Sequence, residues 1–414
     1  MTFSLTYLPL IALSVASLPV EVQQLDGTTV AGRLTHFTTP SLSLQLPEGS
    51  TEIPLEQIQK ITFPNQTTPP QGEGRAWVRL VDGSLLVASA YTSAGNQAQV
   101  VLADGTQLQF ETRHVRSVRF HSQNDQQRRQ WKDILRTPVR SDLIAIRKEE
   151  RIDSLEGVLG DVDTEAVQFQ LDDERIPVRR GKVEGIVYFR GSRDGLPPPV
   201  VRVQDIYGSQ LVVNQWSAEG DQVRFQLPTG LTILRKLDQL SQVDFSSEKV
   251  IYLSDLEPVS VDWQPYLDQP SLLAALRNFF RPRPDRALTA GQLEGDDGKL
   301  RLWMGHQGKS VAQPFEKGLA LHSRTVVTYL CPEDAQYFRA LAGIDARVRR
   351  HGHVRLVLTG DQRELFAEEI SGDQPPREIA LPIAGVRLLE ILVDFGDNQD
   401  IGDHLNLCNA RFIK

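Results

Sequence analysis

Residues 315–323 read Phe-Glu-Lys-Gly-Leu-Ala-Leu-His-Ser, and residues 395–404 read Phe-Gly-Asp-Asn-Gln-Asp-Ile-Gly-Asp-His. Between these two stretches lies the short block Gly343-Ile344-Asp345. Around the blocks, apolar residues alternate with polar ones, as in Val-Arg-Leu-Val-Leu at 354–358. Alternation at a period of two predicts β-strands that bury one face, so we expect residues 248–414 to form an all-β domain.

The order of these blocks resembles that of the NPCBM family, whose name denotes a carbohydrate-binding module. The resemblance covers 248–414, and its most specific pieces are 317–323, 343–345 and 402–404. It implies a jelly-roll or galactose-binding-like β-sandwich. The implied function is binding of carbohydrate, or of another component of the cell envelope, without catalysis.

The closing motif departs from the family pattern. Leu407 stands where the family commonly has Trp, and Asn406 and Asn409 stand where it commonly has Asp. If that Trp is a sugar platform, its loss weakens the case for sugar binding, because sugars are recognised through aromatic faces. If it is a core residue, Leu407 keeps the domain folded and carries no information about a ligand. We favour the core interpretation, because a final strand must bury one face.

The candidate ligand contacts in this domain are Trp303, His322, Asp345, Asp403 and His404. Trp303 would offer an aromatic platform, although a buried Trp is the more common case. His322 would hydrogen-bond a ligand hydroxyl, or else hold Asp345 through a buried hydrogen bond.

An acidic run near the end of the chain is a candidate metal site formed by Asp394, Asp397, Asp400 and Asp403. Carboxylates on a glycine-containing loop suit a structural Ca²⁺, which takes roughly six to eight oxygen ligands. The spacing is not that of an EF-hand, and a solvated acidic turn is the alternative. No other cofactor is expected.

The first 247 residues contain four copies of one small β pattern. Each copy has short alternating strands and a turn, such as Asp26-Gly27 or Asp82-Gly83. Asp-Gly between alternating runs is a strong hairpin signal, because Gly adopts a positive φ without steric cost. Each copy closes with an apolar stretch that ends in an aromatic residue: Phe63, Phe120, Phe189 and Phe245.

Five short strands that curl into a small barrel leave few open edges, so the copies resemble SH3-like or Sm-like barrels. The expected boundaries are 17–70, 71–121, 122–190 and 191–247. One continuous sandwich built from the same strands is the alternative. We also expect a Pro-rich linker at 64–74, an amphipathic helix within 122–140 and a short helix at 272–280.

The N-terminus and the cysteines bear on the compartment. Residues 1–16 are expected to be an export signal, because 5–15 is apolar and small residues follow it. No Lys or Arg precedes Arg33, so a buried strand or helix is the alternative. Cys331 and Cys408 either form a disulfide or are two buried thiols. No stretch reaches the length of a transmembrane helix.

The 414 residues carry a formal net charge of −8, which argues against binding to nucleic acids or anionic membranes. The local basic run of Arg347, Arg349 and Arg350 is interpreted as a solvated strand face and turn. We find no Gly-x-Ser-x-Gly, His-Glu-x-x-His or Walker motif, and two distant cysteines offer no zinc site.

We therefore expect an exported, non-catalytic binding protein in the periplasm or outside the cell. The alternative is a scaffold whose barrels and sandwich bind other proteins. A glycoside-processing enzyme is less favoured, because no pair of carboxylates stands out.

Overall fold

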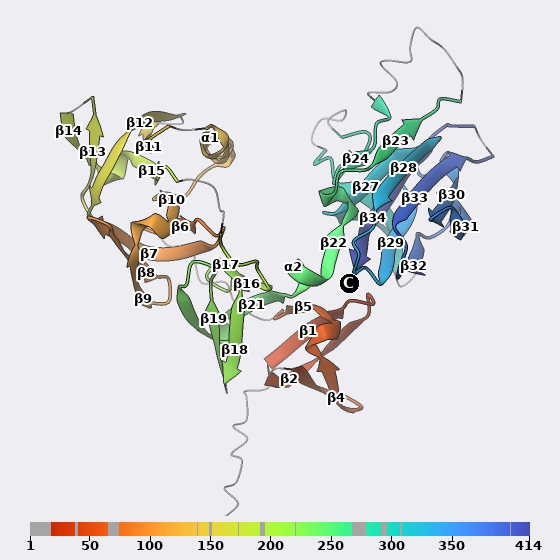
Figure 1. Ribbon diagram of the computed structural model, residues 1–414, viewed down its shortest axis with the longest axis horizontal. Helices are drawn as coiled ribbons and strands as arrows, with labels where there is room; N and C mark the ends of the chain where they lie inside the picture. Colours follow the sequence, from red (N-terminus) through yellow and green to blue (C-terminus); the bar gives the residue numbers. More distant parts are fainter. Residues whose placement is uncertain are drawn as a thin grey trace, which may run out of the picture. The chain divides into compact units, whose positions relative to one another are not determined.

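A computed structural model describes residues 18–37, 40–64, 74–138, 140–148, 151–172, 174–190, 195–219, 221–266, 279–290, 296–306, 309–397 and 399–414. The expected export signal at 1–16 lies outside these residues, as do most of the expected linker and most of the expected helix at 272–280. The chain divides into two compact units, Met1–Ser247 (unit 1) and Glu248–Lys414 (unit 2) (Figure 1). Both consist mainly of strands, which confirms the predicted all-β class.

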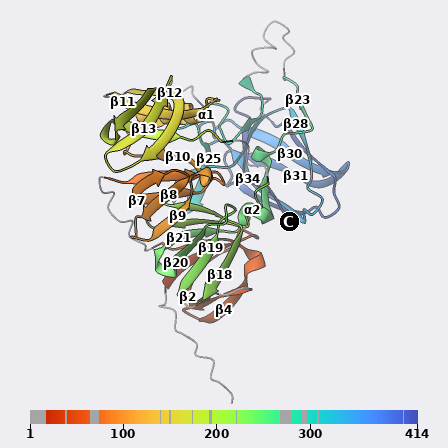
Figure 2. The ribbon, with the colours of Figure 1, turned by 60° about the vertical axis from the view of Figure 1, so that its left-hand side comes forward.

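Unit 1 contains four groups of strands, which we call repeats 1 to 4 (Figure 2). Repeat 1 comprises β1 (Leu18–Gln24), β2 (Thr29–Phe37), β3 (Ser41–Leu46), β4 (Gly49–Pro54), the 3₁₀ turn η1 (Leu55–Gln57) and β5 (Ile58–Thr62). Repeat 2 comprises β6 (Ala76–Leu80), β7 (Leu85–Ala94), β8 (Gln97–Leu102), β9 (Gln107–Glu111), η2 (Thr112–His114) and β10 (Val115–Arg119).

Repeat 3 comprises β11 (Asp142–Lys148), β12 (Arg151–Val162), β13 (Ala166–Leu171), β14 (Glu174–Arg179), η3 (Arg180–Lys182) and β15 (Val183–Val187). Repeat 4 comprises β16 (Val201–Asp205), β17 (Gln210–Val213), β18 (Gln215–Glu219), β19 (Gln222–Gln226), β20 (Thr232–Lys236), η4 (Leu237–Gln239) and β21 (Leu240–Asp244). In every repeat the last strand follows one 3₁₀ turn and pairs antiparallel with the first strand.

The last strands also join the repeats in pairs. β5 of repeat 1 pairs with β21 of repeat 4, where Ile61 faces Val243. β10 of repeat 2 pairs with β15 of repeat 3, where Val118 faces Ile186. In both cases the fourth residue of one strand faces the fourth residue of the other, so each pair of repeats is related by a local pseudo-two-fold axis.

The backbone hydrogen bonds at the two junctions are equivalent. The N–H groups of Phe63 and Phe245 donate to the carbonyls of Ser241 and Gln59, at 3.0 and 2.8 Å. The N–H groups of Phe120 and Tyr188 donate to the carbonyls of Glu184 and Arg116, at 2.9 and 3.0 Å. The closing aromatic residue of repeat 3 is therefore Tyr188 and not Phe189. Tyr188 is 6% exposed and Phe189 is 48% exposed.

Repeats 2 and 4 meet through their first hairpins in another reciprocal contact. Ser84 Oγ accepts a hydrogen bond from the N–H of Val212 at 2.9 Å, and Ser209 Oγ accepts one from the N–H of Val87 at 3.1 Å. Each serine follows a turn glycine with positive φ, and both serines are fully buried. The repeats are thus linked in the order 1, 4, 2, 3.

A buried arginine reinforces the contact between repeats 2 and 4. Arg235 is 2% exposed, and its guanidinium lies 3.1 Å from both Asp205 of repeat 4 and Asp104 of repeat 2. Burial raises the pKa of Asp205 despite the neighbouring arginine. The effect of desolvation on the pKa of Asp205 is therefore larger than the opposing effect of Arg235. Without Arg235, a charged Asp205 would be buried with no counter-ion on its own repeat, which is energetically unfavourable.

The expected helix before repeat 3 is α1 (Asp125–Arg136). Asn124 and Gln127 form a capping box at its N-terminus, which satisfies backbone N–H groups that have no partner within the helix. Trp131 packs with Leu143 and Val187 of repeat 3. In the part of the chain that the structure describes, no helix has both the length and the apolar character needed to cross a membrane.

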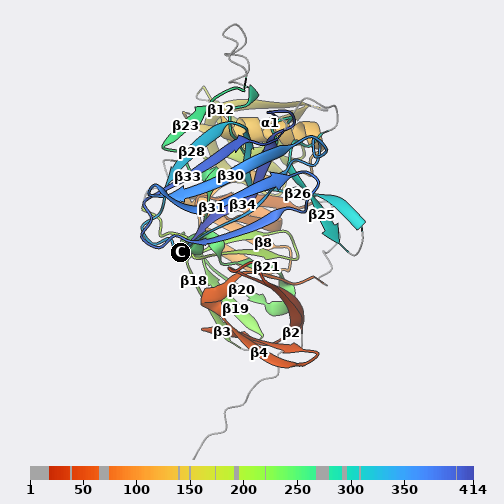
Figure 3. The same ribbon diagram turned by 90° about the vertical axis from the view of Figure 1, so that its right-hand side faces the viewer.

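Unit 2 is a sandwich of two antiparallel sheets (Figure 3). The first contains β22 (Val250–Tyr252), β24 (Arg283–Pro284), β27 (Gly318–His322), β34 (His404–Ile413), β29 (Tyr337–Ile344) and β32 (Arg377–Pro382). The second contains β23 (Ser260–Trp263), β28 (Thr325–Leu330), β33 (Leu388–Phe395), β30 (His353–Gly360) and β31 (Arg363–Ser371). Their inner faces form one apolar core that includes Leu321, Leu356 and Leu407.

Three short elements complete unit 2. The helix α2 (Ser246–Lys249) crosses its boundary, and the 3₁₀ turn η5 (Leu253–Asp255) follows β22. The hairpin of β25 (Leu300–His306) and β26 (Lys309–Phe315) is a separate two-stranded sheet. Cys331 and Cys408 are free and buried, so the disulfide alternative is wrong and the two-thiol alternative holds.

Replacing Arg235 with Met should lower the free energy of unfolding of unit 1 by about 3–5 kcal/mol, because Asp205 is left buried without its counter-ion. Calorimetry of the full chain measures this as a lower transition temperature. Arg224→Met, at an exposed position of β19, is the matched control and should change little. A loss below about 1 kcal/mol for R235M would show that the buried ion pairs do not hold repeats 2 and 4 together.

Candidate functional site

Four loops that cross between the two sheets of unit 2 lie at one end of the sandwich. The strand pairing places them there, since His322 faces His404 and Ile344 faces Leu405 in one sheet, while His353 faces Ser371 in the other. The loops are 323–324, 345–352, 372–376 and 396–403, and we call this region the loop end. The predicted residues His322, Asp345, Asp403 and His404 all lie at or beside it.

His322 lies at the end of β27 and is buried. Its Nδ1 lies 2.5 Å from the carbonyl oxygen of Ser323, and the N–H of the Trp263 indole donates to the same oxygen at 3.2 Å. The ring of Phe280 lies against the imidazole, with 3.7 Å between centroids. Burial lowers the pKa of His322 to about 4, so the ring is neutral near pH 7.

Asp403 is fully buried at the end of the β33–β34 loop, directly before β34. Its Oδ2 accepts a hydrogen bond from the hydroxyl of Ser323 at 2.6 Å, and its Oδ1 accepts one from the N–H of His353 at 3.2 Å. Burial raises the pKa of this carboxyl to about 6, although both hydrogen bonds oppose the shift. Asp403 therefore links its own loop, 396–403, to the loop 323–324 and to the first residue of β30.

His404 is half-buried beside these groups. Its ring centroid lies 5.5 Å from that of His322 and 6.3 Å from that of Phe280. Burial lowers the pKa of His404, while the charge of Asp345 opposes that shift. The two imidazoles and the phenyl ring thus form a compact aromatic cluster behind the loops.

Asp345 is the centre of a second polar cluster. It accepts hydrogen bonds from the side-chain amide of Asn406 at 2.8 Å and from the guanidinium of Arg347 at 3.2 and 3.3 Å. Arg347 also reaches Asp296 at 2.7 Å. The expected hydrogen-bond partner of Asp345, His322, bonds the Ser323 backbone instead. Asn406 is required as a donor here, because an Asp would place a second carboxylate against Asp345.

Trp303 lies on β25, where strand alternation separates two faces. Leu300 and Leu302 face a small apolar core, so Trp303 lies on the opposite face and is half-buried. The guanidinium of Arg349 lies 5.3 Å from its ring centroid, within the range of a cation–π contact. Arg349 is itself held by a 2.6 Å hydrogen bond to the carbonyl of Gly372.

The four aspartates of the predicted metal site are not gathered into one. Among the residues that the structure describes, no group of three or more His, Cys, Asp or Glu side chains is placed to hold a metal ion. Asp403 is engaged by Ser323 and His353, and Asp394 pairs with Arg324 at 3.3 Å. Asp397 is exposed and Asp400 is half-buried, as in the solvated-turn alternative.

Two interpretations of the sequence are settled by burial. Leu407 is fully buried in the sandwich core, which confirms the core interpretation of this position. Arg347, which we interpreted as part of a solvated face, is instead held between Asp345 and Asp296. The basic run could be recognised in the sequence. Its acidic partner Asp296 could not, because it is distant in the chain and no local sequence pattern relates the two.

A comparison with family models matches residues 249–413 to the model described as NPCBM/NEW2 domain. This agrees with the resemblance stated from the sequence. A comparison with curated proteins finds no match.

Several solved structures are similar at low identity. One is a CBM51 module from a Clostridium perfringens GH95 protein in complex with methyl-galactose, at 20% identity and a TM-score of 0.31, covering 39% of this chain and 99% of that chain. Another holds the CBM51-2 and INT domains of Clostridium perfringens ZmpB with GlcNAc, at 18% identity and a TM-score of 0.33, covering 52% and 40%. A third holds tandem CBM51 modules of a family 98 glycoside hydrolase from Streptococcus pneumoniae, at 13% identity and a TM-score of 0.32, covering 95% and 88%.

The two shifted groups of the loop end should give opposite pH dependences. The folded state binds the Asp403 proton more tightly than the unfolded state, so this group stabilises the fold at low pH and the contribution is lost as pH rises from about 4 to 6. The folded state binds the His322 proton less tightly, so stability is lost as pH falls from 6.5 to about 4.

Asp403→Asn and His322→Asn test this prediction as a matched pair. From pH 7 to pH 4, the stability of the unmodified chain relative to D403N should rise by on the order of 2–3 kcal/mol, and its stability relative to H322N should fall by a similar amount. Calorimetry of the full chain follows the transition that both variants shift. Differences that do not change with pH would mean that neither group is shifted by burial.

Proposed function

We propose that unit 2 binds carbohydrate without catalysing a reaction, through the loop end and the adjacent face of the β25–β26 hairpin. The match of residues 249–413 to the NPCBM/NEW2 domain model supports this proposal, because it covers nearly all of unit 2. The exported location expected from the apolar N-terminal run fits a ligand of the cell envelope or exterior, and it belongs to the same proposal.

The observation that carries the proposal is the position of Trp303. Its ring lies on the outer face of a hairpin, half-buried, with Arg349 beside it. A sugar ring presents C–H groups to an aromatic face and hydroxyl groups to charged side chains around that face. Arg349 is fixed by Gly372, and Arg301 lies on the same face of β25 as Trp303, with its guanidinium 2.9 Å from Asp297.

The other predicted residues support this surface from beneath. Asp345 and Asp403 are buried and occupied by hydrogen bonds from the protein itself. His322 is buried against Phe280. We therefore assign these three residues to holding the loops, while His404, which is half-buried, borders the site. Arg347 connects the buried loop residues to the region of the hairpin, because its guanidinium bonds both Asp345 and Asp296.

A glycan array probed with the full chain tests the proposal. Binding to at least one glycan class is expected, and Trp303→Ala should weaken it roughly tenfold or more, because a stacking aromatic face is lost. Tyr337→Ala is the matched control, since Tyr337 is an exposed aromatic residue at the opposite end of β29.

Two outcomes would contradict the proposal. The first is the absence of signal across plant, microbial and animal glycans. The second is equal loss of binding in W303A and Y337A, which would show that Trp303 is not the platform.

A second function, as a scaffold for another protein, rests on unit 1. Repeat 3 exposes three large apolar side chains: Leu155 at 46% and Val158 at 57% on β12, and Ile176 at 37% on β14. Val158 also borders a cavity of about 500 Å³ together with Phe169 and Arg175. Exposed apolar groups next to a concavity are typical of protein contact surfaces.

A crosslinking pull-down with the full chain measures this second function. Val158→Asp should release a partner that the unmodified chain retains, because a charge would be placed in the contact. Retention of the same partner by V158D, or recovery of none by either protein, would count against the scaffold role.

A further inference from the structure

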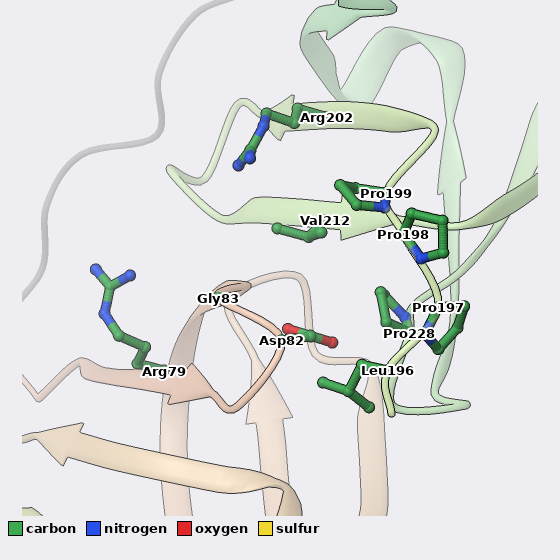
Figure 4. Close-up of a pocket in the computed structure, with 10 residues that line it drawn as sticks. All are labelled: Arg79, Asp82, Gly83, Leu196, Pro197, Pro198, Pro199, Arg202, Val212 and Pro228. Carbon is green, nitrogen blue, oxygen red and sulfur yellow. The ribbon is translucent and has the colours of Figure 1, made fainter. Parts of the chain in front are cut away.

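A cavity of about 400 Å³ lies between repeats 2 and 4 (Figure 4). Repeat 2 contributes Arg79 and the turn residues Asp82 and Gly83. Repeat 4 contributes Arg202 and Val212, and the segment just before β16 contributes Leu196 and three consecutive prolines, 197–199. The volume lies in the range of small-molecule sites.

The walls of this cavity are held in place by contacts already described. The reciprocal bonds of Ser84 and Ser209 join the two hairpins directly beside it. Asp82 adds a third link, because its Oδ2 accepts a hydrogen bond from the hydroxyl of Thr229 at 3.1 Å. The cavity is therefore formed before any ligand arrives, which lowers the entropic cost of binding.

Among the described residues that line the cavity, the charged side chains are two arginines and one aspartate. Asp82 is buried, and both of its carboxylate oxygens accept hydrogen bonds, from the N–H of Ser84 at 2.8 Å and from Thr229. Arg79 and Arg202 reach toward the same open side from opposite walls (Figure 4). A chain with a net charge of −8 thus places two guanidinium groups around one opening. Guanidinium groups bind carboxylates and phosphates through paired hydrogen bonds.

Most of the other described lining residues are apolar, and the prolines among them are rigid. The proline rings of 197–199 and Pro228 offer C–H surface and no backbone N–H donor, and Leu196 and Val212 extend that surface. A ligand of this cavity therefore needs an oxyanion for the arginine side and a carbon skeleton for the proline side.

We propose that this cavity binds a small organic anion, with its carboxylate or phosphate group between Arg79 and Arg202 and its carbon skeleton against the prolines. This site lies within unit 1 and does not depend on carbohydrate binding by unit 2. It gives the repeats a ligand-binding function that is separate from scaffolding.

Four probes separate the requirements of the site. Glucuronate and glucose 1-phosphate carry an anionic group on a sugar-sized skeleton, glucose carries the skeleton alone, and inorganic phosphate carries the anion alone. Calorimetric titration of the full chain should show that one of the two organic anions binds at least about tenfold more tightly than both glucose and inorganic phosphate. The preference between carboxylate and phosphate identifies the class of anion.

Arg202→Gln should weaken that binding roughly ten- to a hundredfold, because one charge-assisted contact is lost. Arg224→Gln is the matched control, since Arg224, like Arg202, is an exposed arginine on a strand of repeat 4, but it is not among the residues that line the cavity. Arg79→Gln should act like R202Q, and W303A should leave this binding unchanged.

Three results would overturn the proposal: no binding of either organic anion at millimolar concentration, equal binding of glucose, or equal losses in R202Q and R224Q. Loss of the anion in W303A would instead place the binding in unit 2, and would also contradict an independent site in unit 1.

Discussion

Unit 1 depends on the hydrogen bonding of the last strand of each repeat. A repeat of five short strands has a core too small to be stable without further burial, and its last strand carries backbone groups that need partners on both edges. The first strand of the same repeat satisfies one edge, and the last strand of another repeat satisfies the other. Because Ile61 faces Val243 in the same register as Val118 faces Ile186, one solution is used twice. The hairpin serines and Arg235 then join the two resulting pairs, and the serine hydrogen bonds lie beside the cavity between repeats 2 and 4.

Unit 2 follows a different logic, in which buried polar groups organise the loops. Asp403 and Asp345 each bind groups from other loops or strands, and their carboxylates are almost inaccessible to water. Buried polar groups of this kind contribute more to specifying one arrangement than to net stability, since desolvation offsets much of their attraction. Desolvation raises the pKa of Asp403 to about 6 and lowers the pKa of His322 to about 4, so both buried side chains are uncharged between these two pH values. The neighbouring surface around Trp303 and Arg349 is where we propose that a ligand binds.

The sequence predicted what local patterns control. Alternation such as that of Leu42 and Leu44, and turns such as Asp82-Gly83, are set by residues close in the chain, so the strands, the all-β class and helix α1 could be predicted. Leu407 could be predicted as a core residue because a closing strand buries one face. The pairing of β5 with β21 could not, since it joins the two ends of unit 1 and no local signal encodes the choice of partner. For the same reason, the sequence could not predict that Arg347 pairs with Asp296. It also could not show that Tyr188, and not Phe189, closes repeat 3 at the junction with repeat 2. The predicted metal site failed because spacing in sequence does not determine whether carboxylates converge.

The order in which the repeats are linked has a consequence for synthesis of the chain. Repeats 2 and 3 are neighbours in sequence, so β10 and β15 can pair as soon as repeat 3 has left the ribosome. Repeat 1 is made first, but its partner strand β21 is made last in unit 1. During all of that interval the outer edge of β5 is an open template for strand addition, which is the feature that draws nascent chains into aggregation. Contacts of such high contact order also form slowly. Repeat 1 is thus the repeat of unit 1 whose last strand waits longest for its partner during synthesis.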